Sequence, residues 1–469
     1  MLTAIKFIFR QPALFKEVFV LAFPLIIGTS AWTIQHFVDR MFLAWYSTQA
    51  VAASMPAGML NMLTMSIFTG TAVFTETFVA QYFGARQFER IGAVMWQGIY
   101  IGLLGAVFHL VLIPFAVPLF QAIGHAPDVL SLEIEYFQTL CLGAGAVICS
   151  AAVASFFAGR GKTRQVMIAT LFQTGVNIIL DYILIFGNLG FPALGIKGAG
   201  LASVISAYSH LIFLLLLAAK QSHQAKYRIY SSWKIDIELF KRIIKYGVPN
   251  GLQATIDLAG FSIFLLLLGR IGTIPLAATN IAFNINILAF MPMIGIGMAV
   301  SILVGQNLGA NNPEKAHICA WTGFIITFLY MLVLAILYVT IPDIFIKPFS
   351  FRADPSEFEN IRHIAVILLR FVAFYSLFDG MNVIFASALR GAGDTRFIMM
   401  AVGFISVLVL IVPSVVFIVL LQKGIYAAWT IATIYVISLA MMFFTRFQQG
   451  KWKNMRVIEY RSFTVDDAS

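Results

Sequence analysis

The stretch Phe172-Gln-Thr-Gly-Val-Asn177-Ile-Ile-Leu-Asp181-Tyr-Ile-Leu-Ile-Phe186 is apolar except for one carboxamide and one carboxylate. Asn177 and Asp181 are four residues apart, so on a helix they lie on the same face, one turn apart. A carboxylate near the centre of a membrane-spanning helix costs roughly 2.5–3.5 kcal/mol. We therefore expect Asp181 to face a wet cavity or a bound cation. The alternative is a carboxylate that neighbouring hydroxyl groups satisfy within the helix packing.

The composition of the whole chain predicts a membrane protein. Of the 469 residues, 60% are hydrophobic and only 11% are charged, which is outside the range of ordinary soluble domains. The net charge of +10 would suit nucleic acid if it formed a basic face on a soluble domain, but the basic residues lie between apolar spans. We therefore predict membrane lipid as a partner and no nucleic acid.

Apolar segments long enough to cross a bilayer recur twelve times along the chain. Most Lys and Arg residues lie in alternate loops and at the two ends, so the positive-inside rule places both termini in the cytoplasm. The first span lacks the cleavage site of a signal peptide, and we expect it to be retained. The spans lie near 15–45, 55–82, 92–121, 132–158, 166–187, 198–219, 246–269, 279–307, 317–345, 363–388, 398–421 and 424–446.

The two halves of the chain repeat one another. Val79-Ala80-Gln81-x-x-Gly84-Ala85 corresponds to Val304-Gly305-Gln306-x-x-Gly309-Ala310, and Pro24 corresponds to Pro249 at the same offset. Each copy holds six spans, so both copies enter and leave the membrane on the same side. Repeats of this kind are parallel, with a cavity at their interface near the bilayer midplane.

These features predict an all-α integral membrane protein with twelve transmembrane helices in two pseudo-symmetric six-helix bundles. We place the N-lobe at residues 1–219, a cytoplasmic linker loop at 220–245, the C-lobe at 246–446 and a cytoplasmic tail at 447–469.

Three motifs in register resemble the multidrug and toxic compound extrusion (MATE) family, in its NorM-like branch, over nearly the full chain. They are the Gln81 motif quoted above, Asn177-x-x-x-Asp181-Tyr182-x-x-Ile185-Phe186-Gly187 with the glycines that follow it, and Leu389-Arg390-Gly391-x-Gly393-Asp394-Thr395. The resemblance implies a V-shaped pair of bundles in a prokaryotic inner membrane. It also implies export of organic cations driven by inward flow of Na+ or H+, without enzyme activity.

The resemblance also carries residue roles. Asp39 stands at the position of the family's acid on the first helix, and Tyr136 matches a tyrosine that faces the same pocket as Asn177 and Asp181. Ser203 takes the place of a pocket hydroxyl. In the second half, Asp257 stands where the branch usually has Glu, and Asp379 stands where it has Asp. The resemblance therefore implies ion or proton coupling through acids in both lobes, together with Tyr136 and Asn177.

The chemistry of these groups allows either coupling ion. The oxygens of Asp39, Asn177 and Asp181 are the hard ligands that a cation such as Na+ prefers, and the same carboxylates can bind protons. The sequence does not choose between the two ions, and we expect no other cofactor.

In the C-lobe, each acid shares a helix face with an amide. Gln253 precedes Asp257 by four residues and Asn382 follows Asp379 by three, and both amides are candidate cavity residues. The alternative for the two aspartates is a structural network that bridges helices.

Several residues near Asp39 depart from the family pattern. Arg40 places a positive charge beside it, and His36, one turn earlier, is either a proton relay or a packing residue. Glu76 either lines the cavity or pairs with Arg40. Trp32, Met41 and Phe283 are candidate lining residues for flat lipophilic cations.

We therefore predict a secondary active exporter of small lipophilic cations that works as a monomer. The alternative is a flippase for a lipid-linked precursor with the same architecture. Such a flippase should line its cavity with cationic side chains, whereas the charges within these spans are mostly acidic.

Overall fold

The computed structural model describes residues 12–220, 225–350 and 355–459. In this part of the chain, twelve helical segments are long and apolar enough to cross a membrane, and no strand occurs. The predicted twelve-span, all-α fold is confirmed. The helices of the first half are α2 (Pro12–Tyr46), α3 (Thr48–Val73) with α4 (Thr75–Gly84), α5 (Ile91–Leu112) with α6 (Ala116–Ile123), α7 (Pro127–Ala158), α8 (Thr163–Phe186) and α9 (Gly195–Ala218). Those of the second half are α11 (Ile237–Leu268), α12 (Thr273–Gly309), α13 (Pro313–Thr340), α15 (Pro355–Ala392), α16 (Thr395–Ile405) with π-helical and α-helical turns as far as Leu420, and α18 (Ile425–Gln448).

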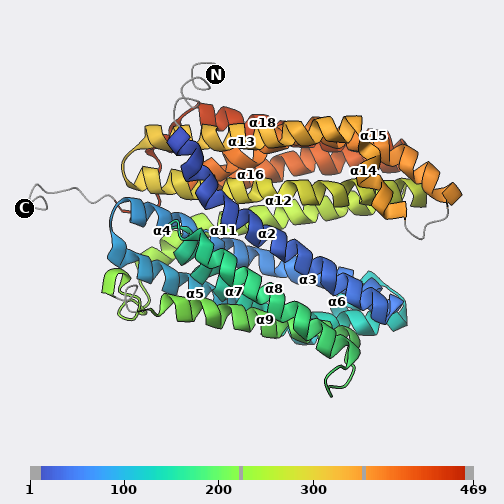
Figure 1. Cartoon of the computed structure of the whole chain (residues 1–469), viewed down its shortest axis with the longest axis horizontal. Helices are drawn as coiled ribbons and strands as arrows, with labels where there is room; N and C mark the ends of the chain where they lie inside the picture. The colour runs from blue at the N-terminus through green and yellow to red at the C-terminus, as the bar shows by residue number, and fades with distance from the viewer. Residues whose placement is uncertain (1–11, 221–224, 351–354, 460–469) are drawn as a thin grey trace, which may run out of the picture.

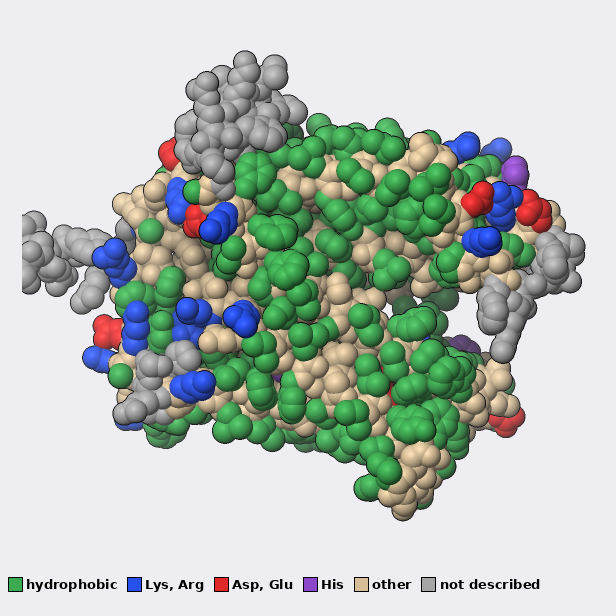
Figure 2. All heavy atoms as spheres, viewed as in Figure 1, with side chains coloured by type: hydrophobic (Ala, Val, Ile, Leu, Met, Phe, Trp, Pro, Cys, Tyr) green, Lys and Arg blue, Asp and Glu red, His purple; other side chains and the backbone are tan. Residues whose placement is uncertain are grey.

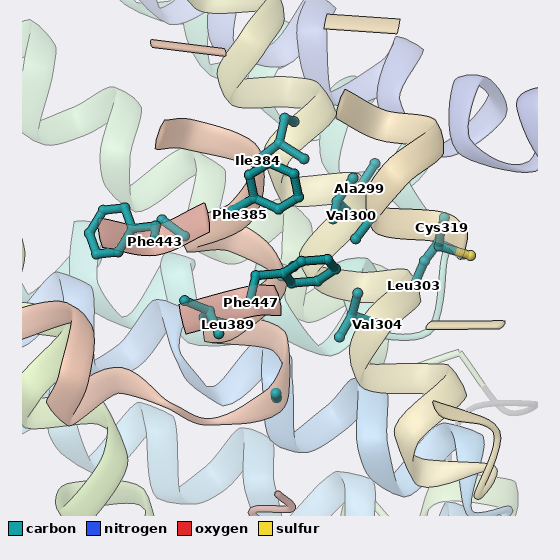
Figure 3. Packing of buried hydrophobic residues seen from close by; sticks show 14 of the residues in the cluster. Ala299, Val300, Leu303, Val304, Cys319, Ile384, Phe385, Leu389, Phe443 and Phe447 are labelled. Carbon is teal, nitrogen blue, oxygen red and sulfur yellow. The ribbon is translucent and has the colours of Figure 1, made fainter. Parts of the chain in front are cut away.

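The helices form two bundles that lie side by side (Figure 1). Each lobe has its own apolar core. In the C-lobe, aromatic rings from α15 and α18 pack against small and branched side chains of α12 (Figure 3), and the ring centroids of Phe385 and Phe447 lie 4.8 Å apart. Dense packing of this kind lets each lobe move as a unit.

The first helix of each half starts against the opposite lobe. Leu14 and Val18 of α2 are buried in the C-lobe core, and α2 then crosses to the N-lobe (Figure 1). In the same way, Leu239 and Ile243 of α11 are buried in the N-lobe core. The two crossing helices therefore tie the lobes together at one end of the molecule.

Two predicted boundaries of the linker and tail differ from the structure. The predicted loop 220–245 ends too late, because α11 already begins at Ile237. Its start is fixed by Asp236, whose side chain accepts a hydrogen bond from the backbone N–H of Leu239 (3.0 Å), as an N-cap residue does. The predicted tail 447–469 begins with the end of α18, and its residues up to Glu459 are folded against both lobes rather than extending away as a tail.

The repeated Gln-x-x-Gly motifs pack against each other across the lobe interface. A Cβ added to Gly84 would lie 1.9 Å from the Gln306 carbonyl oxygen, and one added to Gly309 would lie 2.0 Å from that of Gln81. The two glutamines also reach across in equivalent ways: Gln81 Nε2 donates to the Gly391 carbonyl (3.0 Å), and Gln306 Nε2 donates to the Gly159 carbonyl (2.8 Å). We call these two Gln-x-x-Gly segments the gate.

The gate closes one end of the interface and leaves the other end open. Most Lys and Arg side chains gather at the gate end in Figure 2, which we call the basic end. Toward the opposite end, the surface is hollowed between the two lobes (Figure 2). The molecule is therefore in a state that is open away from the basic end.

Candidate functional site

The N-lobe holds a compact acid cluster between α2 and α8. Asp39, Asn177 and Asp181 are all buried, with exposed fractions of 5%, 0% and 0%. The two carboxyl groups share a hydrogen bond. With its amide nitrogen turned toward them, Asn177 donates to Asp39 Oδ1 (2.8 Å) and Asp181 Oδ2 (3.3 Å). The spacing that places Asn177 and Asp181 on one helix face thus brings both to the acid of the first helix.

The polar groups of this cluster are not fully satisfied by the protein. Asp181 Oδ1 is buried and has no hydrogen-bond partner among the described residues. Tyr136 of α7 is buried nearby, and both carboxyl groups act electrostatically on its phenol. In the described part of the chain, no group of three or more His, Cys, Asp or Glu side chains is arranged to hold a metal ion. A cation here would therefore rely on the Asn177 and Tyr136 oxygens as well as on the two carboxylates.

The sequence reasoning missed one member of this cluster, Gln35. Its side chain is buried, 5% exposed, and lies 3.2 Å from the Asn177 amide nitrogen. Gln35 precedes Asp39 by four residues, so the same helical spacing that linked Asn177 to Asp181 would have found it.

The neighbours of Asp39 form a path toward an apolar cavity. His36 Nδ1 lies 3.7 Å from Asp39 Oδ2, and the half-exposed His36 ring meets Trp32 edge to face at 4.4 Å. Trp32 borders a cavity of ≈ 320 Å³ between α2, α8 and α12 that Met167 and Met291 also line. A role of His36 as a proton relay and of Trp32 in binding substrate stays a prediction. Arg40 is exposed, and its charge acts on Asp39.

The C-lobe acids are arranged differently. Gln253 Nε2 donates to Asp257 Oδ2 (2.7 Å), and Arg390 Nη2 donates to Gln253 Oε1 (3.2 Å). Asp257 also shares a hydrogen bond with Tyr435 of α18. Asp257 is therefore part of a polar network that links α11, α15 and α18.

Asp379 lies outside this network. Its Oδ1 accepts a hydrogen bond from Asn382 Nδ2 (3.3 Å), and its charge acts on the phenols of Tyr375 and Tyr435. The structure thus supports both predicted pairs, Gln253 with Asp257 and Asn382 with Asp379. Both aspartates act electrostatically on Tyr435, but only Asp257 shares a hydrogen bond with it.

Of the two alternatives for Glu76, the pairing with Arg40 is wrong. Glu76 is buried in α4, and the charged group that acts on it is Arg390 of the C-lobe. Arg390 comes close because α4 and α15 meet at the gate, where Thr77 Oγ1 also donates to the Arg390 carbonyl (3.4 Å). Arg390 therefore lies between an acid of each lobe, Glu76 and Asp257.

Three other predicted cavity residues have packing contacts of their own. Met41 packs against an N-lobe core cluster, and Phe283 stacks on Trp429 at 5.0 Å within the C-lobe core. Ser203 is partly buried, and its carbonyl accepts a hydrogen bond from Ser206 on the same helix.

The fold and site together define a class of protein. The chain forms two helical lobes that are related by an internal repeat, and each lobe contains buried acids. The interface between the lobes is closed at one end only. This is the architecture of a secondary transporter.

Comparison with known proteins identifies the family. The MatE family model matches residues 24–183 and 252–416, once in each lobe, and the chain belongs to this family. It is 29% identical over 397 residues to the multidrug resistance protein PmpM of Pseudomonas aeruginosa, covering 84% of this chain and 82% of PmpM. It is 25% identical over 453 residues to a probable multidrug resistance protein NorM of Thermotoga maritima, covering 95% of each. The family consists of membrane transporters, not enzymes.

Solved structures have the same fold. An outward-facing multidrug resistance MATE family transporter superposes with a TM-score of 0.84 at 20% identity, covering 94% of this chain and 97% of that one. A eukaryotic MATE transporter gives a TM-score of 0.82 at 17% identity, covering 95% and 97%. At these identities the likeness concerns the fold alone.

Proposed function

We propose that the protein exports lipophilic organic cations in exchange for Na+ or H+, by alternating opening of the two lobes. The observation that carries the proposal is the buried Asp39, Asn177 and Asp181 cluster inside the fold of a multidrug transporter family. The curated relatives are named as multidrug resistance proteins, which favours drug export over the flippase alternative.

Coupling would arise because the carboxyl groups of Asp39 and Asp181 cannot both be ionised unless a cation is bound between them. Two carboxyl groups within hydrogen-bond reach must share a proton or hold a cation between them, since two bare charges at that distance repel strongly. Rotation of the Asn177 amide by half a turn would replace its N–H donor with an oxygen ligand for Na+. The same cluster can therefore accept either ion.

A cationic substrate would compete for the same negative charge. When the drug binds near ionised carboxylates, it displaces the proton or Na+, and binding of the ion releases the drug. Trp32, Met167 and Met291 line an apolar cavity beside His36, and such side chains adapt to flat lipophilic groups. This competition requires the cavity to open alternately to the two sides, by rocking of one lobe against the other.

The proposed orientation places the basic end in the cytoplasm of a prokaryotic inner membrane. Loops rich in Lys and Arg stay on the cytoplasmic side during insertion, so the open end would face outward. Each acid cluster is complete within one chain, so we propose that the monomer transports.

The test is efflux of a fluorescent lipophilic cation from proteoliposomes. An inward Na+ gradient and an inward pH gradient are imposed in separate experiments, with vesicles that carry Asp181→Asn protein as the control. Efflux driven by one gradient supports antiport and names the ion. If neither gradient drives efflux and the same vesicles scramble lipid, the result would overturn the proposal in favour of the flippase.

A further inference from the structure

The segment from Gly450 to Glu459 runs from the C-lobe to the N-lobe across the basic end. It follows α18 and begins with a short 3-10 turn, Lys451–Asn454. Two parts of this segment are anchored in different lobes. We call the segment the strap.

The base of the strap belongs to the C-lobe. Trp452 is fully buried in the C-lobe core, where its ring stacks on Phe447 at 4.9 Å and its Nε1 donates to the Phe447 carbonyl (2.9 Å). Lys453 forms an ion pair with Glu314 at the start of α13 (2.8 Å). These contacts stay within one lobe, so they fix the origin of the strap without linking the lobes.

The tip of the strap packs into the N-lobe, where Val457 also lies against Gly393 of the C-lobe. Val457 and Ile458 are 2% and 7% exposed and lie in the N-lobe core cluster. The backbone N–H of Val457 donates to Gln81 Oε1 (2.9 Å), whose own Nε2 reaches the Gly391 carbonyl across the gate. The strap therefore completes the hydrogen bonding of one gate glutamine.

The carboxylate of Glu459 fastens the tip. It accepts a hydrogen bond from Tyr82 (2.6 Å) and pairs with Arg90 (3.1 Å), both on the N-lobe. It also pairs with Arg242 of α11, the first helix of the C-lobe. Arg242 lies between Leu239 and Ile243, on the part of α11 that packs in the N-lobe core, so all three partners of Glu459 lie on the N-lobe side. Hydrogen bonds to a charged group are about twice as strong as neutral ones.

The gate is symmetric, but the strap is not. Gln306, the repeat equivalent of Gln81, donates to the Gly159 carbonyl and borders a cavity of ≈ 380 Å³ lined by Lys16 and Glu17. The described part of the strap bonds to Gln81 and not to Gln306. Separation of the lobes at the basic end must therefore break the strap contacts on the Gln81 side in addition to the two equivalent halves of the gate.

We propose that the strap is a latch that holds the basic end closed, with Glu459 as the residue that positions its tip. The inference rests on the alternating opening proposed above. Opening of the basic end releases Glu459 from Tyr82, Arg90 and Arg242, and withdraws Val457 and Ile458 from the N-lobe core. The latch biases the resting protein toward the state that is open at the opposite end.

The test measures the opening itself rather than transport. Spin labels are placed at Arg164→Cys and Arg396→Cys, two exposed and repeat-equivalent positions on α8 and α16, beside the native cysteines, which are buried. Distances between the labels are measured by electron spin resonance on the full chain in liposomes. In the latched protein, the short distance should dominate.

Glu459→Gln should raise the ratio of open to closed populations by about tenfold, as expected for loss of a charge-assisted contact. Arg242→Gln should shift it in the same direction, and the double variant should shift it by less than the sum, because both changes remove one interaction. Glu314→Gln breaks the ion pair at the base of the strap, within one lobe, and should leave the distances unchanged.

An unchanged distance distribution in Glu459→Gln protein of wild-type melting temperature would overturn the latch. An equal shift in Glu314→Gln would also overturn it, since the effect would then be general loosening. This readout needs no transported substrate, so a failure of ion-driven efflux would count against the proposed function and leave the latch standing.

Discussion

The acid clusters of the two lobes occupy the same scaffold but have different partners. In the N-lobe, Asp39 and Asp181 bond to each other and to Asn177, and one buried carboxylate oxygen of Asp181 has no partner among the described residues. In the C-lobe, Asp257 is joined through Gln253 to the guanidinium of Arg390. Each aspartate thus has a cation of the protein near it, but Arg390 is held in a hydrogen-bonded network, whereas Arg40 beside Asp39 is exposed.

Under the proposed exchange of ions, this difference would let the two copies of the duplicated unit take different tasks. Arg390 also acts on Glu76 of the other lobe, so the C-lobe network is connected to the closure of the gate. A counter-charge held in a hydrogen-bonded network is suited to linking conformation and charge, whereas the N-lobe site, whose nearby Arg40 is exposed, suits the proposed exchange of ions. Asp379 accepts a hydrogen bond from the Asn382 amide and acts electrostatically on the phenols of Tyr375 and Tyr435, so it differs from both other acids.

The largest effect is expected from Asp181→Asn. The change removes the negative charge that would hold the coupling ion but keeps the size of the side chain, so ion-driven efflux should fall to the level of protein-free vesicles. The measurement is the proteoliposome efflux described above, with expression checked by membrane content. Asp128→Asn, an exposed acid at the start of α7, is the control and should transport normally. Retained efflux in the Asp181 variant would remove the N-lobe cluster from the mechanism.

The next largest effect is expected from Arg390→Met. Removal of one partner of a buried charge network leaves the others uncompensated and typically costs about 3–5 kcal/mol. The melting temperature of the purified protein should therefore fall clearly, and a second change, Asp257→Asn, should restore part of the loss. Asp379→Asn leaves the Arg390 network intact and should have a smaller effect. If Arg390→Met has the melting temperature of the wild type, the Arg390 guanidinium does not stabilise the C-lobe network.

The gate offers a test in which the two halves should agree. Gly84→Ala and Gly309→Ala each place a methyl group against a carbonyl oxygen of the opposite lobe, so neither variant can close the basic end without displacing backbone. Both should shift the spin-label distance between positions 164 and 396 toward the open state by similar amounts. Gly58→Ala is the control, because its added Cβ would meet no atom within 4 Å. A shift in only one of the two gate variants would mean that the halves close independently.

Much of this architecture could be predicted from local patterns. Hydropathy gave the twelve spans, and helical spacing placed Asn177 beside Asp181. The partner of Glu76 could not be found in this way, because Arg390 is far away in sequence and approaches only where α4 packs against α15. The strap was missed for a related reason. The polar composition of residues 450–459 predicts an exposed tail. The burial of this segment depends on contacts with both lobes, which local sequence patterns do not reveal.

The smallest effect concerns the pH dependence of the strap. Burial raises the pKa of Glu459, but hydrogen bonds from Arg242 and Tyr82, with the charge of Arg242, outweigh it and hold the pKa at about 2, below its usual value of 4.5. Arg90, itself paired with Asp236, faces the same carboxylate. A carboxyl group with a lowered pKa stabilises the folded contact above its usual pKa and loses that effect only as the pH falls from 4.5 toward 2.

The strap should therefore contribute no change in the label distances between about pH 5 and pH 8. Any opening of the basic end in that range should have the same pH midpoint in the wild type and in Glu459→Gln, because it would come from the membrane-embedded acids. The measurement is the spin-label distance between positions 164 and 396, taken from pH 5 to pH 8 in the wild type and in Glu459→Gln. If the pH response disappeared in Glu459→Gln, the strap itself would be the proton sensor, and the division between an ion-exchanging N-lobe and a fixed-charge C-lobe would have to be revised.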